Sequence, residues 1–234
     1  MFADQLSKDP DTYNVSITLN NDGIGGYTTS NIYDLITSDQ KVVNDIKNAD
    51  VITLLCGANN ITYAMLYQLE QSGQISLPWN FDMQGKDVDT FYNISTDVLT
   101  NTNNYYHKEM ITKTNKDLHN IIDTINQYNN DCIIIIGTIY YDRQFFISLF
   151  MQMLDINQTY AEKMADNYYI SAKEIQSYFN DVSSEYSNVY LTDTSDEAKD
   201  SYFQYDENGK FLDLHPNKEG QEILANCFYR EMIK

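Results

Sequence analysis

Near the carboxyl end of the chain, one residue separates an aspartate from a histidine in the segment Asp213-Leu214-His215-Pro216. Pro216 disfavours the helical conformation for His215, and residues two apart in an extended chain project to the same side. The Asp213 carboxylate could then hold the His215 ring in the tautomer that a general base requires. The alternative is a surface aspartate and a histidine beside the start of the last helix, and this segment alone does not separate the two.

A second candidate segment spans residues 21–30 and reads Asn-Asp-Gly-Ile-Gly-Gly-Tyr-Thr-Thr-Ser. Its three glycines permit tight turns, and its threonines and serine are favoured caps for a following helix. Backbone N–H groups in such a loop could bind an oxyanion. Taken alone, a loop of this kind is more often a plain turn, and it lacks the Gly-Lys-Ser/Thr ending of phosphate-binding loops.

A third segment, Gly57-Ala58-Asn59-Asn60, directly follows an apolar run that ends at Cys56. An asparagine at this position can donate a hydrogen bond to an oxygen that becomes negative in a transition state. The alternative is a simple turn, in which asparagine tolerates a left-handed conformation.

Nearly continuous apolar runs at 51–56 and 132–136 predict central parallel strands covered on both faces. A shorter run at 189–191 is a further strand candidate. Alternating apolar and polar residues over 13–19 predict a strand with one buried face, as at the edge of a sheet.

Apolar residues at steps of three and four predict helices between these strands, at 32–46, 111–125, 161–182 and 223–228. Strands that alternate with helices imply βαβ units and a layered α/β fold with a parallel sheet. We expect one domain over 1–234, with an irregular insert at about 74–106 that contains Trp79. Active sites in such folds lie at the carboxyl ends of the strands.

The charge balance disfavours polyanionic partners. Fifteen Lys and Arg against 34 Asp and Glu give a formal charge of −19, which repels nucleic acid and anionic lipid headgroups. The acidic residues are dispersed through the sequence, as on the solvated surface of a folded protein. No apolar run is long enough to span a bilayer, and the first residues lack a signal-peptide pattern, so we expect a soluble chain without integral membrane contact.

The cysteines and two of the histidines suggest no metal or disulfide framework. Cys56, Cys132 and Cys227 lie within apolar runs and are odd in number, which predicts buried free thiols. His107 and His119 fall in one helical pattern at different azimuths, which disfavours a shared metal site.

Together, in this order and spacing, the three segments resemble the SGNH or GDSL-type serine hydrolases, a flavodoxin-like α/β family of esterases, lipases and acylhydrolases. The glycine block of that family matches residues 23–29, its Gly-x-Asn-Asp block matches 57–60, and its acid-histidine block matches 213–217. The resemblance covers essentially the whole chain. It implies a three-layer fold in which a parallel sheet has helices on both faces.

The resemblance also implies roles. The Gly26 N–H and the Asn59 side chain would be oxyanion-hole donors, His215 the general base and Asp213 its orienting acid. It implies no metal and no organic cofactor, and its substrates would be small esters such as acylated lipids or carbohydrates.

The chain departs from the family pattern at three places. Asn60 replaces the usual aspartate, and the acid lies at 213 instead of 212, where the chain has leucine. The Gly-Asp-Ser block that supplies the nucleophile is missing, since residues 1–7 resemble the helix downstream of it, and Ser7 lies too far into that segment to replace it. The first strand of the family is therefore expected to be absent from this chain.

Two explanations of the missing block remain open. Either the natural protein begins upstream, or the chain is a nucleophile-less relative that fills the gap with another element or another copy of itself. We favour the first explanation, in which the complete protein is a carboxylic ester hydrolase. Its location stays open between secretion, with a signal lost together with the missing N-terminal segment, and the cytoplasm. The alternatives are a non-catalytic carbohydrate- or lipid-binding module with Trp79 and the Tyr-rich insert as its contact surface, and a structural homo-oligomer.

Overall fold

A three-stranded parallel sheet forms the centre of the computed structural model, which describes residues 18–76, 87–154, 156–195 and 216–232. Its order is β1 (Val51–Leu55), β2 (Ile133–Gly137) and β3 (Val189–Thr192). All three strands were predicted from their apolar runs, and each lies within one residue of its expected bounds. The parallel direction is confirmed as well, because both strand pairs are parallel.

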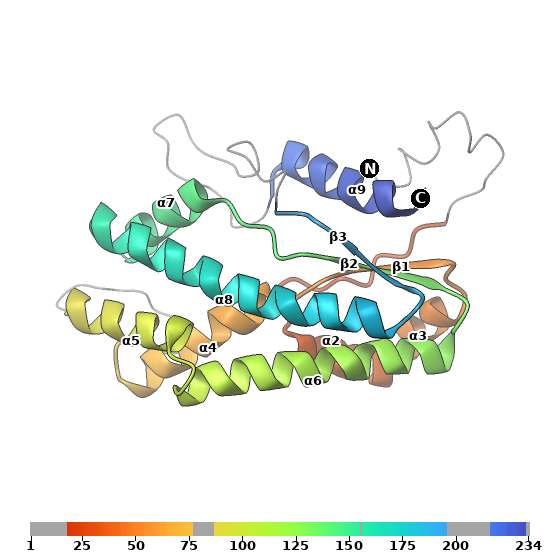
Figure 1. Cartoon of the computed structure of the whole chain (residues 1–234), viewed down its shortest axis with the longest axis horizontal. Coiled ribbons are helices and arrows are strands. Elements are labelled where there is room, and N and C mark those ends of the chain that lie inside the picture. Colours follow the sequence, from red (N-terminus) through yellow and green to blue (C-terminus); the bar gives the residue numbers. More distant parts are fainter. Residues whose placement is uncertain (1–17, 77–86, 155, 196–215, 233–234) are drawn as a thin grey trace.

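Helices lie on both sides of this sheet (Figure 1). In chain order the described helices are α2 (Thr29–Ser38), α3 (Gln40–Lys47), α4 (Ala58–Gln71), α5 (Val88–Thr100), α6 (Tyr105–Tyr128), α7 (Arg143–Leu154), α8 (Gln158–Glu185) and α9 (Lys218–Met232). Figure 1 shows α9 on one side of the strands and the long helices α6 and α8 on the other. The layered α/β architecture expected from the sequence is confirmed.

The two faces of the sheet are covered unequally. Ile134 and Ile136 are fully buried and belong to the main core cluster, which includes the apolar stripes of α6 and α8. On the α9 side, Leu55, Ile133 and Tyr190 keep 44%, 36% and 45% of their surface exposed. The expectation that 51–56 forms a central strand is wrong for the described part of the chain, in which β1 pairs with β2 alone and lies at the edge of the sheet.

Helix α8 shows how apolar spacing determines the packing on the covered face. Every position from which its pattern was predicted is buried, namely Ala161, Met164, Tyr168, Ala172, Ile175, Phe179 and Val182. Steps of three and four place these side chains on one stripe of the helix, and burial of such a stripe is the main driving force for helix formation in a protein.

Two helical predictions need correction. The pattern at 32–46 forms two helices, because Asp39 is extended and its side chain accepts hydrogen bonds from the Lys41 and Val42 N–H groups as the cap of α3. The insert at 74–106 is not irregular throughout, since α5 occupies 88–100 and buries Phe91, Val98 and Leu99. Its many β-branched and polar residues obscured the stripe in the sequence.

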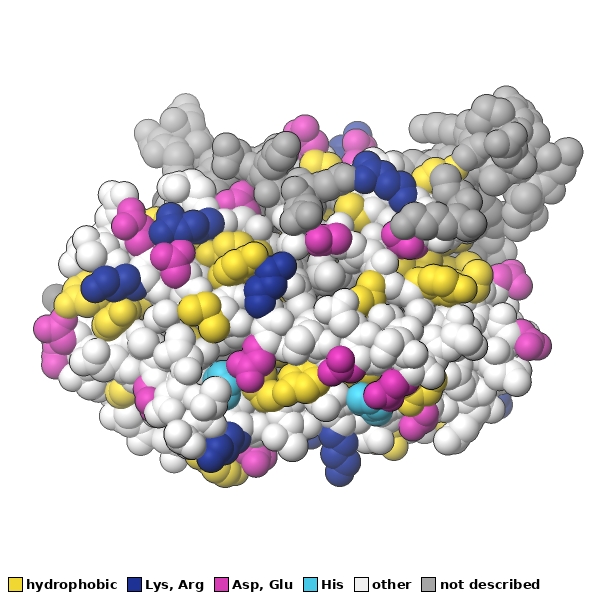
Figure 2. All heavy atoms as spheres, in the orientation of Figure 1, with side chains coloured by type: hydrophobic (Ala, Val, Ile, Leu, Met, Phe, Trp, Pro, Cys, Tyr) yellow, Lys and Arg dark blue, Asp and Glu magenta, His cyan; other side chains and the backbone are white. Residues whose placement is uncertain are grey.

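The remaining expectations fall at the limits of the described residues. Of the strand predicted over 13–19, residues 13–17 lie outside the described residues. Leu19 lies in no regular element and is exposed. Trp79 also lies outside the described residues. Acidic side chains are scattered over the face in Figure 2 and do not form one patch. Among the described helices, none is both long and apolar enough to cross a bilayer.

Candidate functional site

The turn from β1 into α4 depends on Gly57. Its backbone has φ +97°, a conformation that side-chain-bearing residues rarely adopt. A Cβ at this position would lie 3.2 Å from Ile175 Cγ2 and 3.3 Å from both Ile139 Cδ1 and Phe179 Cζ. Glycine therefore allows the chain to leave the carboxyl end of β1 and enter a helix at once, which places Asn59 and Asn60 in the first turn of α4.

The glycine-rich loop leads directly into α2. Gly26 has φ +82°, and the Tyr27 N–H donates to the Ile24 carbonyl at 3.4 Å, which closes a turn. Thr28 then caps α2 in a reciprocal arrangement with Asn31, in which each side chain accepts from the other residue's backbone N–H. The local sequence thus fixes both the turn and the point at which the helix begins.

Asn59 joins these two segments. Its side-chain Nδ2 donates to the Tyr27 carbonyl at 2.9 Å, across 32 positions of sequence. Gly26 is exposed and Asn59 is half-buried, so both can be reached from solvent. The structure therefore brings the first turn of α4, with Asn59, beside the loop that contains Gly26 at the carboxyl end of β1. Binding of an oxyanion there stays a prediction.

Asn60, beside it, is buried and makes three hydrogen bonds. Its Oδ1 accepts from the Thr29 N–H at 3.1 Å, and its Nδ2 donates to Thr29 Oγ1 at 2.9 Å and to Thr114 Oγ1 at 2.8 Å. The Asn60 side chain thus holds the start of α2 against α4 and α6.

Sequence reasoning missed Asp117 on α6. This carboxylate is buried, and its Oδ2 accepts from Ser30 Oγ and, at 3.3 Å, from Thr29 Oγ1. A signal was present, because Thr114 and Asp117 fall on the same stripe of α6 as the buried Met110 and Ile121. Polar residues on an apolar stripe indicate a buried hydrogen-bonding network.

The predicted acid and base, Asp213 and His215, lie outside the described residues, so their pairing stays a prediction. The described chain resumes at Pro216, and the Asn217 side chain accepts from the Gly220 N–H at 2.8 Å at the start of α9. At the carboxyl ends of β2 and β3, the Thr194 N–H donates to Thr138 Oγ1 at 2.9 Å. These strand ends lie at the same end of the sheet as Gly57, where all three strands finish.

The other two histidines make separate contacts. His107 is buried, with Nδ1 2.9 Å from the Val98 carbonyl and Nε2 3.1 Å from Glu174 Oε2. His119 Nε2 lies 3.1 Å from Glu185 Oε2. Within the described residues, no three histidine, cysteine or acidic side chains are grouped as metal ligands would be.

The cysteines are free and buried, as predicted. Cys56 immediately precedes Gly57, and burial raises the pKa of its thiol to about 12. Because the thiolate is the nucleophilic form, Cys56 is unsuited to replace a catalytic serine.

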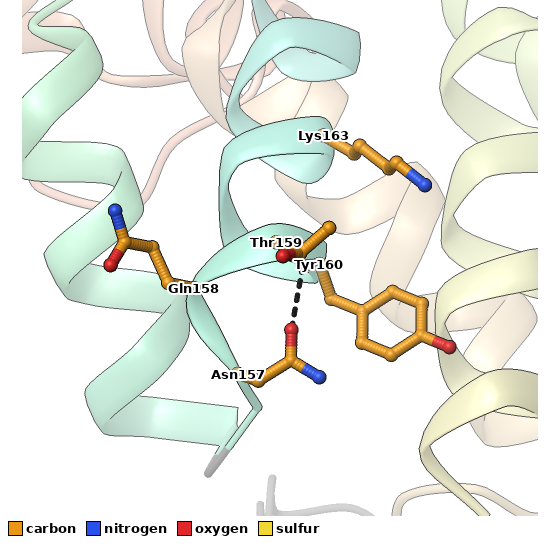
Figure 3. Close-up of a pocket in the computed structure, with 5 residues that line it drawn as sticks. All are labelled: Asn157, Gln158, Thr159, Tyr160 and Lys163. Carbon is orange, nitrogen blue, oxygen red and sulfur yellow. Dashed lines mark hydrogen bonds between the residues drawn. The ribbon is translucent and has the colours of Figure 1, made fainter.

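A shallow hollow of about 480 Å³ lies at the start of α8, and neither Gly26 nor Asn59 lines it (Figure 3). Its lining consists of Asn157, Gln158, Thr159, Tyr160 and Lys163. Figure 3 shows Asn157 Oδ1 accepting from the Tyr160 N–H, the hydrogen bond that caps the helix. The Asn157 side chain therefore serves as the N-terminal cap of α8.

The chain was compared with protein families, curated proteins and solved structures. No model of a protein family matches the chain, and no curated protein matches it in sequence. Among solved structures, the lipase Lip_vut3 from a goat rumen metagenome superposes with a TM-score of 0.54 at 14% identity, over 98% of this chain and 84% of that chain. At that identity the likeness shows the fold alone. The predicted three-layer α/β fold, in which a parallel sheet has helices on both faces, agrees with this likeness.

Proposed function

We propose that this chain is the larger part of a carboxylic ester hydrolase of the SGNH or GDSL type. The observation that carries the proposal is the Asn59 Nδ2 contact with the Tyr27 carbonyl, which places an amide donor beside the glycine loop. Convergent N–H donors at the carboxyl end of a parallel strand are what acyl transfer needs to stabilise a tetrahedral oxyanion. The fold shared with a lipase adds support.

The reaction we propose has two steps. A serine oxygen attacks the ester carbonyl while His215 takes the serine proton, and Asp213 holds the imidazole in the required tautomer. The Gly26 N–H and the Asn59 amide stabilise the oxyanion until the alcohol leaves with the proton from His215. Water, activated by the same histidine, then releases the acid and restores the serine.

In this proposal the serine is supplied by residues encoded upstream of Met1. The edge of β1 supports such an element, because its sequence Val-Ile-Thr-Leu-Leu carries no charge and no described strand lies beyond it. An apolar edge strand with no partner on one side is rare in isolated folded proteins, so the described residues leave a place for one more strand beside β1. The DNA immediately before the Met1 codon should encode, in frame, an apolar strand and Gly-Asp-Ser, and a stop codon there would contradict this part of the proposal.

Turnover tests the function directly. We expect the extended chain, defined as the 234 residues preceded by that upstream segment, to hydrolyse short-chain p-nitrophenyl esters, with release of p-nitrophenol followed by absorbance. The 234-residue chain serves as the control and should show no turnover, because it lacks the nucleophile. Saturable binding of acylated lipid or carbohydrate by the extended chain without any hydrolysis would favour the non-catalytic binding module instead.

A further inference from the structure

The start of α2 is held by one buried polar cluster, formed by Thr29, Ser30, Asn60, Thr114 and Asp117. These residues come from three helices, α2, α4 and α6, and all except Ser30 are buried. Thr29 follows Gly26 by three positions, so the cluster holds the point at which the glycine loop enters α2.

The direction of every hydrogen bond in the cluster can be deduced. A backbone N–H can only donate, so the atom of Asn60 that faces the Thr29 N–H is its carbonyl oxygen, and the other atom is the NH₂ group. That group donates to both Thr29 Oγ1 and Thr114 Oγ1. Thr29 Oγ1 therefore accepts from Asn60, which leaves its own proton for Asp117.

Asp117 completes this pattern as an acceptor. Its Oδ2 receives the hydroxyl protons of Thr29 and Ser30, and Lys113 Nζ lies 3.5 Å from the same oxygen. A carboxylate at position 60 could not donate to the two threonines, and it would place a second negative charge in the same buried cluster. The hydrogen bonds of the cluster thus suit one carboxylate, which in this chain is that of Asp117.

We propose that Asn60 and Asp117 are a matched pair of positioning residues, which together orient the Gly26 N–H for the oxyanion of the proposed ester hydrolase. The inference rests on the proposed function for the use of that N–H. The coupling between positions 60 and 117 can be measured independently of catalysis. The pair acts through Thr29 and Ser30 and touches no substrate.

A charge relocation tests the pairing in the 234-residue chain. Asn60→Asp should lower the melting temperature by about 5 °C or more, because two carboxylates then flank the Thr29 hydroxyl, which has a single proton. The double variant Asn60→Asp/Asp117→Asn should recover most of that loss, since the new carboxylate at 60 accepts from both threonines and the new carboxamide at 117 donates to Thr29 Oγ1. Asn44→Asp, an exposed site on α3, adds the same charge as a control and should change little.

The backbone amide resonance of Gly26 distinguishes positioning from packing. In ¹H–¹⁵N spectra, Asp117→Asn alone should shift the Gly26 resonance, and the double variant should return it toward the wild-type position. Asp117→Asn is nearly isosteric, so this measurement remains decisive if Asn60→Asp does not fold. If the double variant melts no higher than Asn60→Asp, the pairing of positions 60 and 117 is wrong. If the Gly26 resonance does not shift in Asp117→Asn, the positioning role is wrong.

The same variants in the extended chain separate this inference from the proposed function. Asp117→Asn should lower kcat for p-nitrophenyl esters several-fold with little change in KM, because the oxyanion donor is used in the transition state and not in substrate binding. A wild-type extended chain without ester turnover contradicts the proposed function, while the melting temperatures and the Gly26 resonance still decide the pairing. An unchanged kcat in an active Asp117→Asn variant overturns the inference and leaves the function intact.

Discussion

Replacement of His215 by alanine in the extended chain is expected to lower kcat for p-nitrophenyl esters on the order of 10⁴-fold or more. The serine hydroxyl is a weak nucleophile at neutral pH, and an adjacent base is what activates it. In the sequence, His215 follows Asp213 by two residues and precedes Pro216, which disfavours a helical conformation at that position. The glycine and asparagine segments that accompany it are the ones expected of a hydrolase of this type. Initial rates over a range of ester concentrations give kcat and KM.

The matched control for this variant is His119→Ala. His119 is partly exposed on α6, and its Nε2 contacts Glu185 on α8, so its loss removes a surface contact and leaves the loops at β1 unchanged. We expect its kcat to stay within about twofold of wild type, since the contact lies at the surface between α6 and α8 and surface substitutions of this kind have small effects. Equal turnover in His215→Ala and His119→Ala would contradict the assignment of the base.

Gly57→Ala is expected to be the most destabilising single-methyl addition at the site. The substitution imposes a side chain at φ +97° and drives a Cβ to within 3.2–3.3 Å of Ile175, Ile139 and Phe179. Each of the two effects, the backbone strain and the overpacking, costs on the order of 1–3 kcal/mol. Urea denaturation followed by circular dichroism measures the summed loss in the free energy of unfolding.

Gly73→Ala separates the two contributions. Gly73 also has a positive φ, +72°, but a Cβ there would meet no atom within 4 Å. Its loss of stability should therefore report the backbone strain alone, and Gly57→Ala should exceed it by the overpacking cost. If the two variants lose the same stability, the close packing of Ile139, Ile175 and Phe179 around Gly57 is not a constraint on the turn.

The strands and the long helices were predictable because their signals are local. Each strand is an apolar run a few residues long, and α8 repeats its apolar positions at the helical period over more than twenty residues. Helix α5 was missed because Thr, Asn, Ser and Asp separate its apolar positions, and burial of Phe91 and Leu99 outweighs the weak helix propensity of those residues.

The candidate site was predictable only in part. Glycine blocks and strand-end asparagines can be recognised in a sequence, so Gly26 and Asn59 were identified, and the structure places their loops together. The cluster around Asn60 was not predicted, because its members are far apart along the chain. Thr29 lies 31 positions from Asn60 and 88 from Asp117, and Asn60 lies 54 positions from Thr114. Contacts of that separation depend on how α4 and α6 pack, which no local pattern of residue types specifies.

The central claim is that this chain, once preceded by its nucleophile, forms an acyl-enzyme. Intact-mass spectrometry of the extended chain, quenched with acid within seconds of adding p-nitrophenyl acetate, tests it most directly. We expect an added mass of one acetyl group on the serine of the upstream Gly-Asp-Ser, and no such adduct in His215→Ala. Ester turnover without any acylated protein, or an adduct that forms equally in His215→Ala, would contradict it.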